Sequence, residues 1–129
     1  HWEEVARDKN KIKLDLDIAA YDYLASIKQL VTITVRCDGK IVGYHWSIVR
    51  NHLHYKGSLT AYTDVYYLYP EYRKGSVGIN LFKFFEQEMR KLGVQKMYSA
   101  TKTGHDVSPV FEYLDWEKAE NVHTKYIGD

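Results

Sequence analysis

The sequence predicts a mixed α/β fold (α+β), in which a mostly antiparallel central sheet carries helices on both faces. Residues 31–49 alternate apolar and polar side chains around an Asp-Gly turn, a pattern typical of a β-hairpin. Residues 59–100 then follow the order strand, helix, strand, which requires a parallel strand pair with a right-handed crossover. The length of 129 residues fits one domain, so residues 1–129 are predicted to form a single domain.

The first half of the chain is expected to form two helices and then the hairpin. Apolar side chains recur at helical spacing, with Trp2, Val5 and Ala6 in the first helix and Ile18, Tyr21, Leu24 and Ala25 in the second. The polar stretch between these helices is expected to be a loop. The predicted helices span residues 1–8 and 17–29, and the hairpin strands span residues 31–36 and 41–49 with a turn at 37–40.

The second half contains the clearest helix, at residues 78–92, which Gly93 is expected to end in a left-handed conformation. Its predicted apolar face comprises Leu81, Phe82, Phe85, Met89 and Leu92. The other predicted elements are a loop at 50–57, a strand at 59–69 ended by Pro70, a strand at 94–100, a loop at 101–106, a short helix at 108–114 and a last strand at 122–127.

The overall composition narrows the class of partner. A formal charge of +1 argues against nucleic acid. Apolar residues make up 45% of the chain, but no apolar run reaches the length of a membrane span, so no membrane partner is expected. The single cysteine, Cys37, excludes an internal disulfide and a cysteine-based zinc site, and it fits a cytoplasmic location.

The segment Tyr69-Pro-Glu-Tyr-Arg-Lys-Gly-Ser-Val-Gly78 lies between a predicted strand and the clearest helix. Backbone N–H groups at a helix start form an anion site, and glycines let a phosphate approach the backbone closely. Arg73 and Lys74 add positive charge. The segment therefore indicates a phosphate-bearing ligand, although an ordinary solvated turn has a similar composition.

The same segment, with its strand before and its apolar helix after, resembles the pyrophosphate loop of the GNAT N-acetyltransferase superfamily. Residues 111–116, Phe-Glu-Tyr-Leu-Asp-Trp, resemble the family's later Tyr-Glu-x-Leu-Gly-Phe segment, and the hairpin ending in Ile41-Val-Gly-Tyr44 resembles its early Gly-x-x-Val-Gly strands. The element order agrees over nearly the whole chain. Within the superfamily, the chain looks closest to uncharacterised proteins encoded by bacteriophages.

The resemblance implies a fold, a cofactor and a set of contacts. The strand around Leu68 would splay from its parallel neighbour and hold the pantetheine arm of acetyl-CoA, and the loop would hold the pyrophosphate. The partners implied are acetyl-CoA (coenzyme A after transfer) and an amine-bearing small molecule or protein, with a homodimer left open. The cofactor-binding residues implied are Tyr67, Leu68, Arg73, Lys74, Gly75, Ser76, Val77, Gly78 and Phe111.

Two residues depart from the family pattern. Ser76 stands where the family loop usually has its first glycine, although a serine can cap a helix and bond a phosphate. Phe111 stands where many members have a tyrosine that protonates the departing thiolate, and phenylalanine has no proton to give. These departures keep a second hypothesis open, in which the chain is a catalytically degenerate module of the same fold that binds acyl-CoA or has a structural or interaction role.

Asp64 is the candidate base for acetyl transfer. It lies on the strand four residues before Leu68, near where many family members keep a carboxylate. Strand alternation predicts that it faces the same side as Tyr66 and Leu68. His105, in the loop after the next strand, and Tyr126 are the candidates for the acid. Asp106 is expected to cap the helix that follows rather than to catalyse.

The candidate substrate-binding residues are more scattered. Glu4 lies on the first predicted helix, where an acidic side chain suits an amine. His52, His54 and Tyr55 lie in the loop before the strand that carries Asp64. Two histidines without a third ligand argue against a metal site. The sequence does not indicate which amine is the acceptor.

Overall fold

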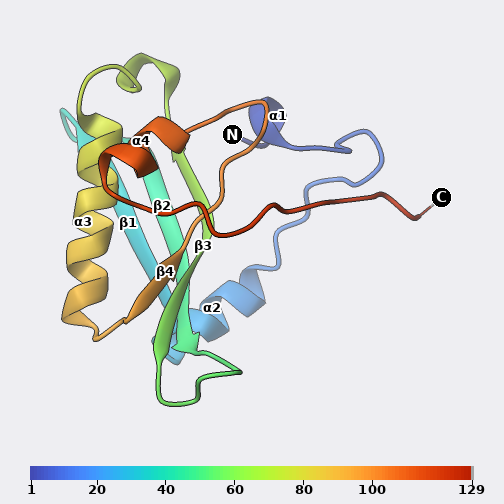
Figure 1. Ribbon diagram of the computed structural model, residues 1–129. Helices are drawn as coiled ribbons and strands as arrows, with labels where there is room; N and C mark the ends of the chain where they lie inside the picture. Colours follow the sequence, from blue (N-terminus) through green and yellow to red (C-terminus); the bar gives the residue numbers. More distant parts are fainter. Residues whose placement is uncertain (129) are drawn as a thin grey trace. The chain divides into compact units, whose positions relative to one another are not determined.

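The computed structural model describes residues 1–128 (Figure 1). These residues divide into two compact units. One unit comprises residues 17–100, and the other comprises residues 1–16 with residues 101–128. The larger unit contains α2 (Ile18–Ser26), β1 (Leu30–Cys37), β2 (Lys40–Asn51), β3 (Leu59–Leu68), the 3₁₀ turn η1 (Pro70–Tyr72), α3 (Val77–Lys91) and β4 (Lys96–Tyr98). The smaller unit contains α1 (Trp2–Val5) and α4 (Ser108–Tyr113).

The sheet of the larger unit has the strand order β1-β2-β3-β4. The first three strands are antiparallel, and β4 runs parallel to β3, which confirms the predicted mixed topology. The hairpin turn is also confirmed, because Asp38 and Gly39 both have positive φ, 49° and 79°, as a two-residue turn of this type requires. The β2–β3 pairing begins at Asn51, so β2 extends two residues into the segment expected to be a loop.

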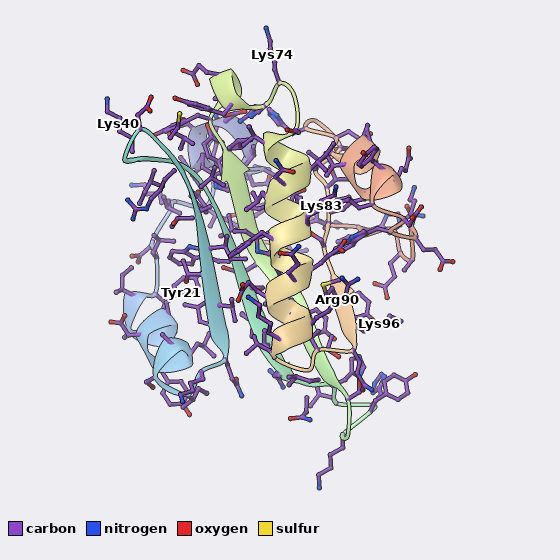
Figure 2. All side chains as sticks on the ribbon, turned by 90° about the vertical axis from the view of Figure 1, so that its left-hand side faces the viewer. Tyr21, Lys40, Lys74, Lys83, Arg90 and Lys96 are labelled. Atoms are coloured by element: carbon purple, nitrogen blue, oxygen red, sulfur yellow. The ribbon has the colours of Figure 1, made fainter. Side chains whose placement is uncertain are left out.

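The core lies between the sheet and α3. The helix buries Leu81, Phe82, Phe85 and Met89, of which Phe85 is fully inaccessible to solvent. The rings of Phe82 and Phe85 contact the His45 ring of β2 at 5.5 Å and 4.1 Å between centroids. Figure 2 shows α3 crossing one face of the sheet, with its cationic side chains Lys83 and Arg90 labelled on the solvent side. Leu92 was expected on the apolar face, but the helix ends at Lys91 and Leu92 is half exposed.

The opposite face of the sheet carries α2, so helices cover both faces as predicted. Asp17 caps this helix through its Oδ1, which accepts a hydrogen bond from the N–H of Ala20 at 2.9 Å. The predicted apolar face is only partly correct. Tyr21 and Leu24 are half buried, whereas Ile18 and Ala25 are exposed.

Three elements differ from the sequence prediction. The first helix has only four residues because Ala6 is already extended (φ −71°, ψ 136°). The strand expected at 94–100 is limited to Lys96–Tyr98, since only these residues pair with β3. The strand expected at 122–127 is absent: alternation suggested it, but within residues 1–128 no strand pairs with this segment, and an unpaired strand leaves its backbone groups unsatisfied.

A buried polar cluster lies beneath α3. His45 and Ser47 of β2 are fully inaccessible to solvent, and the His45 ring centroid lies 4.1 Å from that of Phe85. Its Nε2 shares a hydrogen bond of 3.2 Å with the Thr63 hydroxyl, whereas His45 Nδ1 and Ser47 Oγ have no partner among the described residues. Burial lowers the pKa of His45 to about 4 from its ordinary value of 6.5.

We predict that His45 makes stability depend on pH. Because the folded pKa is depressed, the unfolded chain binds more protons between pH 6.5 and pH 4, so stability is present above pH 6.5 and is lost as the pH falls toward 4. The loss attributable to this group is about 3 kcal/mol at pH 4. Urea unfolding at pH 7 and pH 4 should show that His45→Phe loses about 3 kcal/mol less than the wild-type protein.

The control is His123→Gln, which changes an exposed histidine and should leave the pH dependence as it is in the wild-type protein. Equal losses in the wild-type protein and in His45→Phe would show that the imidazole is not kept neutral by burial.

Candidate active site

The loop after β3 presents a row of backbone donors. The 3₁₀ turn closes with a hydrogen bond of 3.2 Å from Arg73 N to Pro70 O, and Gly75 then turns the chain into α3 with φ 78°, a conformation that favours glycine. The first helical hydrogen bond runs from Asn80 N to Ser76 O at 2.8 Å. Within residues 1–128, the N–H groups of residues 74–79 have no acceptor, and such a row at a helix start binds anions.

Ser76 fits this loop without strain. Its φ of −99° and ψ of 2° are open to any residue, so the glycine that the family pattern has here is not required by the backbone. Ser76 stands at the N-cap position, but its side chain makes no capping bond within residues 1–128. Its hydroxyl receives only a long contact, 3.5 Å, from Asn80 Nδ2. The substitution therefore leaves the amide row intact and adds a hydroxyl beside it.

The two cations of the loop differ in how they are held. Arg73 Nε donates to the carbonyl oxygen of Leu68 at 2.8 Å, and its guanidinium carbon lies 5.2 Å from the centre of the Tyr67 ring. Lys74 is exposed and projects from the loop at the start of α3 (Figure 2). Both charges stand next to the amide row, which raises its attraction for phosphate.

Beside this loop, β3 and β4 stop pairing early. Their parallel register covers only Thr60–Tyr62 and Lys96–Tyr98, although β3 continues to Leu68. Beyond the last pair, a side chain connects the two segments, because the Tyr66 hydroxyl donates to the carbonyl oxygen of Ala100 at 2.6 Å. The upper part of β3 therefore separates from the segment after β4, as the resemblance implied.

Asp64 lies at a β-bulge, which overturns its predicted orientation. Trp46 pairs with Val65 and Ser47 pairs with Thr63, so Asp64 is an extra residue in β3. Because of this extra residue, the side chains after Asp64 alternate between the two faces of the sheet in the opposite phase to those before it. Tyr66 contacts the Phe82 ring of α3 at 5.2 Å between centroids, whereas the Asp64 carboxylate lies on the α2 face and accepts a hydrogen bond of 2.6 Å from the Tyr21 hydroxyl.

The predicted histidine loop lies at the other end of β3. His54 N donates to His52 Nδ1 at 3.0 Å, and the His52 ring lies 5.0 Å from that of Tyr55. This loop precedes Leu59, whereas the amide row follows Leu68, so roughly 30 Å of strand lies between them. The structure brings the three predicted residues together with one another but not with the anion loop, and their substrate role stays a prediction.

The smaller unit holds the other candidates. His105 Nδ1 lies 3.6 Å from the Glu4 carboxylate, an ion pair when the imidazole is protonated, so two predicted residues are neighbours. Phe111 contacts the Trp116 ring at 5.1 Å between centroids. Lys11 Nζ lies 4.7 Å from the centre of the Tyr126 ring.

Asp106 was expected to cap the helix that became α4, but the N-cap position is Val107 and Asp106 lies one residue before it. Its Oδ1 accepts a hydrogen bond from Ser108 N at 2.9 Å, which satisfies one of the N–H groups that a helix leaves without an intrahelical partner. Hydrogen bonds from the Ser108 side chain and backbone hold the pKa of Asp106 below its usual range.

Two residues of the site are not predicted from the sequence. Tyr21 bonds Asp64, and Tyr66 spans the gap between β3 and Ala100. Tyr21 carried one available signal, since it was on the predicted inner face of its helix. The bulge carried none, because the alternation of residues 59–68 is also compatible with regular pairing.

Among the 128 residues that the structure describes, no three side chains of His, Cys, Asp or Glu converge on a point that would hold a metal ion. Over the same residues, no helix has the length and hydropathy needed to cross a bilayer.

Comparison with solved structures establishes the fold. An aminoglycoside N-acetyltransferase AAC(6')-Iy, in complex with a bisubstrate analogue, aligns with a TM-score of 0.70 at 18% identity over 100% of this chain and 90% of its own. Glucosamine-6-phosphate N-acetyltransferase from Arabidopsis thaliana aligns at 0.70 and 12% identity over 86% and 76%. A transcriptional regulator from Bacillus halodurans aligns at 0.73 and 17% identity over 85% and 74%. Comparison with curated proteins gives no match.

A mixed sheet that opens beside an amide-lined loop defines an acyl-CoA-dependent acyltransferase fold. The chain belongs to the acetyltransferase (GNAT) family, whose model matches residues 2–111. Its cofactor is acetyl-CoA, the donor that enzymes of this family use. The amides of residues 74–79, with Arg73 and Lys74, fit the pyrophosphate of this cofactor in charge and in hydrogen-bond polarity.

We predict that the missing side chain at Gly78 serves acetyl-CoA binding and is not required for folding. A Cβ built at Gly78 meets no atom within 4 Å, so the protein itself has room for a side chain. Gly78→Ala should therefore raise the free energy of unfolding, by up to about 1 kcal/mol, because alanine is the better helix former. The same methyl group should weaken acetyl-CoA binding about tenfold by crowding the phosphates.

Chemical denaturation and calorimetric titration measure these two effects. Gln87→Ala, at an exposed position of the same helix, is the matched control and should leave acetyl-CoA affinity unchanged. Wild-type affinity in Gly78→Ala would place the phosphates away from the start of α3.

Proposed function

We propose that the protein transfers the acetyl group of acetyl-CoA directly to an amine, without a covalent enzyme intermediate. The observation that carries this proposal is the row of unpaired amides at residues 74–79, which begins six residues after the last residue of β3 and continues into the first turn of α3. Asp64 lies on the same strand, so the candidate base and the candidate cofactor loop belong to one unit.

In the proposed reaction, the amine nitrogen bonds to the acetyl carbon and the carbon–sulfur bond breaks. An ammonium ion and the thioester give an amide, the CoA thiol and one released proton. Asp64 would accept the proton that makes the amine nucleophilic, directly or through a water molecule. Backbone N–H groups of the open part of β3 would polarise the carbonyl.

The acid remains open between His105 and Tyr126, since Phe111 has no proton to give. The Glu4 carboxylate next to His105 Nδ1 supports His105, because the ion pair orients the ring and leaves Nε2 as the proton-carrying atom. Tyr126 contacts a cation, Lys11, through its ring. Both assignments are proposals that rest on the smaller unit alone.

The acceptor is proposed to be an amine-bearing small molecule or a protein. Two of the similar structures are named for amine-bearing acceptors, an aminoglycoside and glucosamine 6-phosphate, which supports the first alternative. We also propose that the protein acts in the cytoplasm, where acetyl-CoA is available, and that its nearest kin are phage-encoded members of the family. A homodimer stays a prediction.

A second candidate function is a non-catalytic module that binds acyl-CoA. Phe111 favours it, because the ring packs against Trp116 and supplies no acid. The two candidate functions share the amide row and differ in turnover, so binding and catalysis need separate measurements.

We predict that acetyl-CoA stabilises the protein. At a concentration about 100 times its dissociation constant, the ligand should add about 2.7 kcal/mol to the free energy of unfolding. A thermal-shift titration with acetyl-CoA and with CoA measures the effect. Dephospho-CoA, which lacks only the 3′-phosphate, and pantetheine, which also lacks the pyrophosphate, serve as graded controls. The absence of any shift would reject both candidate functions.

We further predict that Asp64→Asn lowers turnover about 100-fold without changing acetyl-CoA affinity, since general-base catalysis contributes about that factor. Release of CoA thiol is measured with a panel of sisomicin, spermidine and a peptide with a free N-terminus. Asp22→Asn, at an exposed carboxylate of α2, is the control and should keep wild-type turnover. Unchanged turnover in Asp64→Asn would remove Asp64 as the base.

A further inference from the structure

The α2 face of the sheet carries a row of aromatic rings beside Asp64. Tyr21 of α2 meets Trp46 edge to face at 5.1 Å between centroids, and Tyr44 lies 6.4 Å from Trp46. The row continues to Tyr67, whose ring is 6.0 Å from that of Tyr44. These four residues come from one helix and two strands of the larger unit, and we call them the aromatic row.

The Asp64 carboxylate is held by one oxygen only. Its Oδ2 accepts a hydrogen bond of 2.6 Å from the Tyr21 hydroxyl, while Oδ1 has no partner within residues 1–128. The side chain is exposed, so Oδ1 is accessible to a ligand. The bulge places this carboxylate at the end of the row rather than beneath α3.

Tyr21 is suited to hold the carboxylate in one orientation. Its ring is fixed by the edge-to-face contact with Trp46, and Figure 2 shows the residue on α2 facing the sheet. The hydrogen bond to Asp64 raises the pKa of Tyr21 to about 12, with burial and the carboxylate charge adding to the effect. The hydroxyl therefore remains a donor at any physiological pH.

The row already binds one cation. At its far end, the Arg73 guanidinium lies 5.2 Å from the centre of the Tyr67 ring. Aromatic faces attract cations through the negative potential of the ring, and a carboxylate adds a charge-assisted hydrogen bond. Rings and a carboxylate together are the chemistry that recognises an ammonium ion.

We propose that Tyr21, Trp46 and Asp64 form a binding site for the acceptor as an alkylammonium ion. Asp64 Oδ1 accepts a hydrogen bond from the ammonium group, the Trp46 ring contacts the attached methylenes, and Tyr21 is a positioning residue that holds Asp64 through Oδ2. The inference rests on the proposed function, which it deepens by naming the protonated form and the contacts of the acceptor.

The experiment measures amine binding without turnover. The probe is n-butylammonium chloride, titrated into isotope-labelled protein while the indole N–H signal of Trp46, assigned with Trp46→Phe, is followed by NMR. The expected result is saturable movement of that signal. n-Butanol, which has the same alkyl chain without the charge, and sodium chloride at matched ionic strength should not produce it.

Variants test the role of each side chain. Asp64→Asn should weaken n-butylammonium binding about tenfold, because a charged acceptor is lost. Tyr21→Phe keeps the ring and loses the hydroxyl, so it should weaken binding several-fold in the wild-type background and not at all in the Asp64→Asn background, as expected for residues that act through one another. Tyr23→Phe, at an exposed position of the same helix, should have no effect.

The outcomes separate this site from the proposed function. No movement of the Trp46 signal, equal binding of n-butanol, or unchanged binding in Asp64→Asn would each overturn the ammonium site. Equal effects of Tyr21→Phe in both backgrounds would overturn the positioning role. An acetyl-CoA thermal shift without amine binding would leave the proposed function standing and reject the ammonium site. Amine binding without an acetyl-CoA shift would reject the proposed function and leave the ammonium site standing.

Discussion

The extra residue at Asp64 is the constraint on which the arrangement of this protein depends. The α3 face of β3 carries no charged side chain, and it receives Ala61 and Thr63 before the bulge and Tyr66 and Leu68 after it. If the alternation ran unbroken back from Leu68 and Tyr66, it would direct the Asp64 carboxylate toward Phe82 and Phe85, where an unpaired charge costs several kcal/mol. The bulge avoids this cost by turning Asp64 to the α2 face, where a tyrosine hydroxyl meets it.

The bulge also divides β3 into two parts that differ in their pairing. Below it, the sheet is closed on both sides of β3, because β2 and β4 both pair with the strand. Above it, β3 pairs only with β2 in the described chain, and the strand leads directly into the amide row. One strand therefore has a half that pairs with β4 and a half that does not, with the change of register between them.

Local patterns in the sequence predicted much of this fold. The period of two, the Asp-Gly turn and the apolar face of α3 depend on neighbours in the chain, and the structure confirms them except at Leu92, which is half exposed. The prediction of a strand at 122–127 was wrong because alternation of side chains does not supply a hydrogen-bonding partner for the backbone. The predicted orientation of Asp64 was wrong because a bulge is a mismatch between two strands, and the sequence of one strand alone does not reveal it. Tyr21 lies 43 residues from Asp64, so no local pattern joins them.

The bond from Tyr66 to Ala100 determines how the gap beside β3 is held. A ladder of backbone hydrogen bonds opens only when several bonds break together, but this connection is one hydroxyl on one rotatable side chain. Such a bond contributes about 1 kcal/mol net. Beyond the three paired positions of β3 and β4, the Tyr66 side chain therefore takes the place of a backbone ladder, with its hydroxyl bonded to Ala100 and its ring packed against Phe82. The spacing of the two segments at this end of the sheet thus depends on how one tyrosine ring is packed.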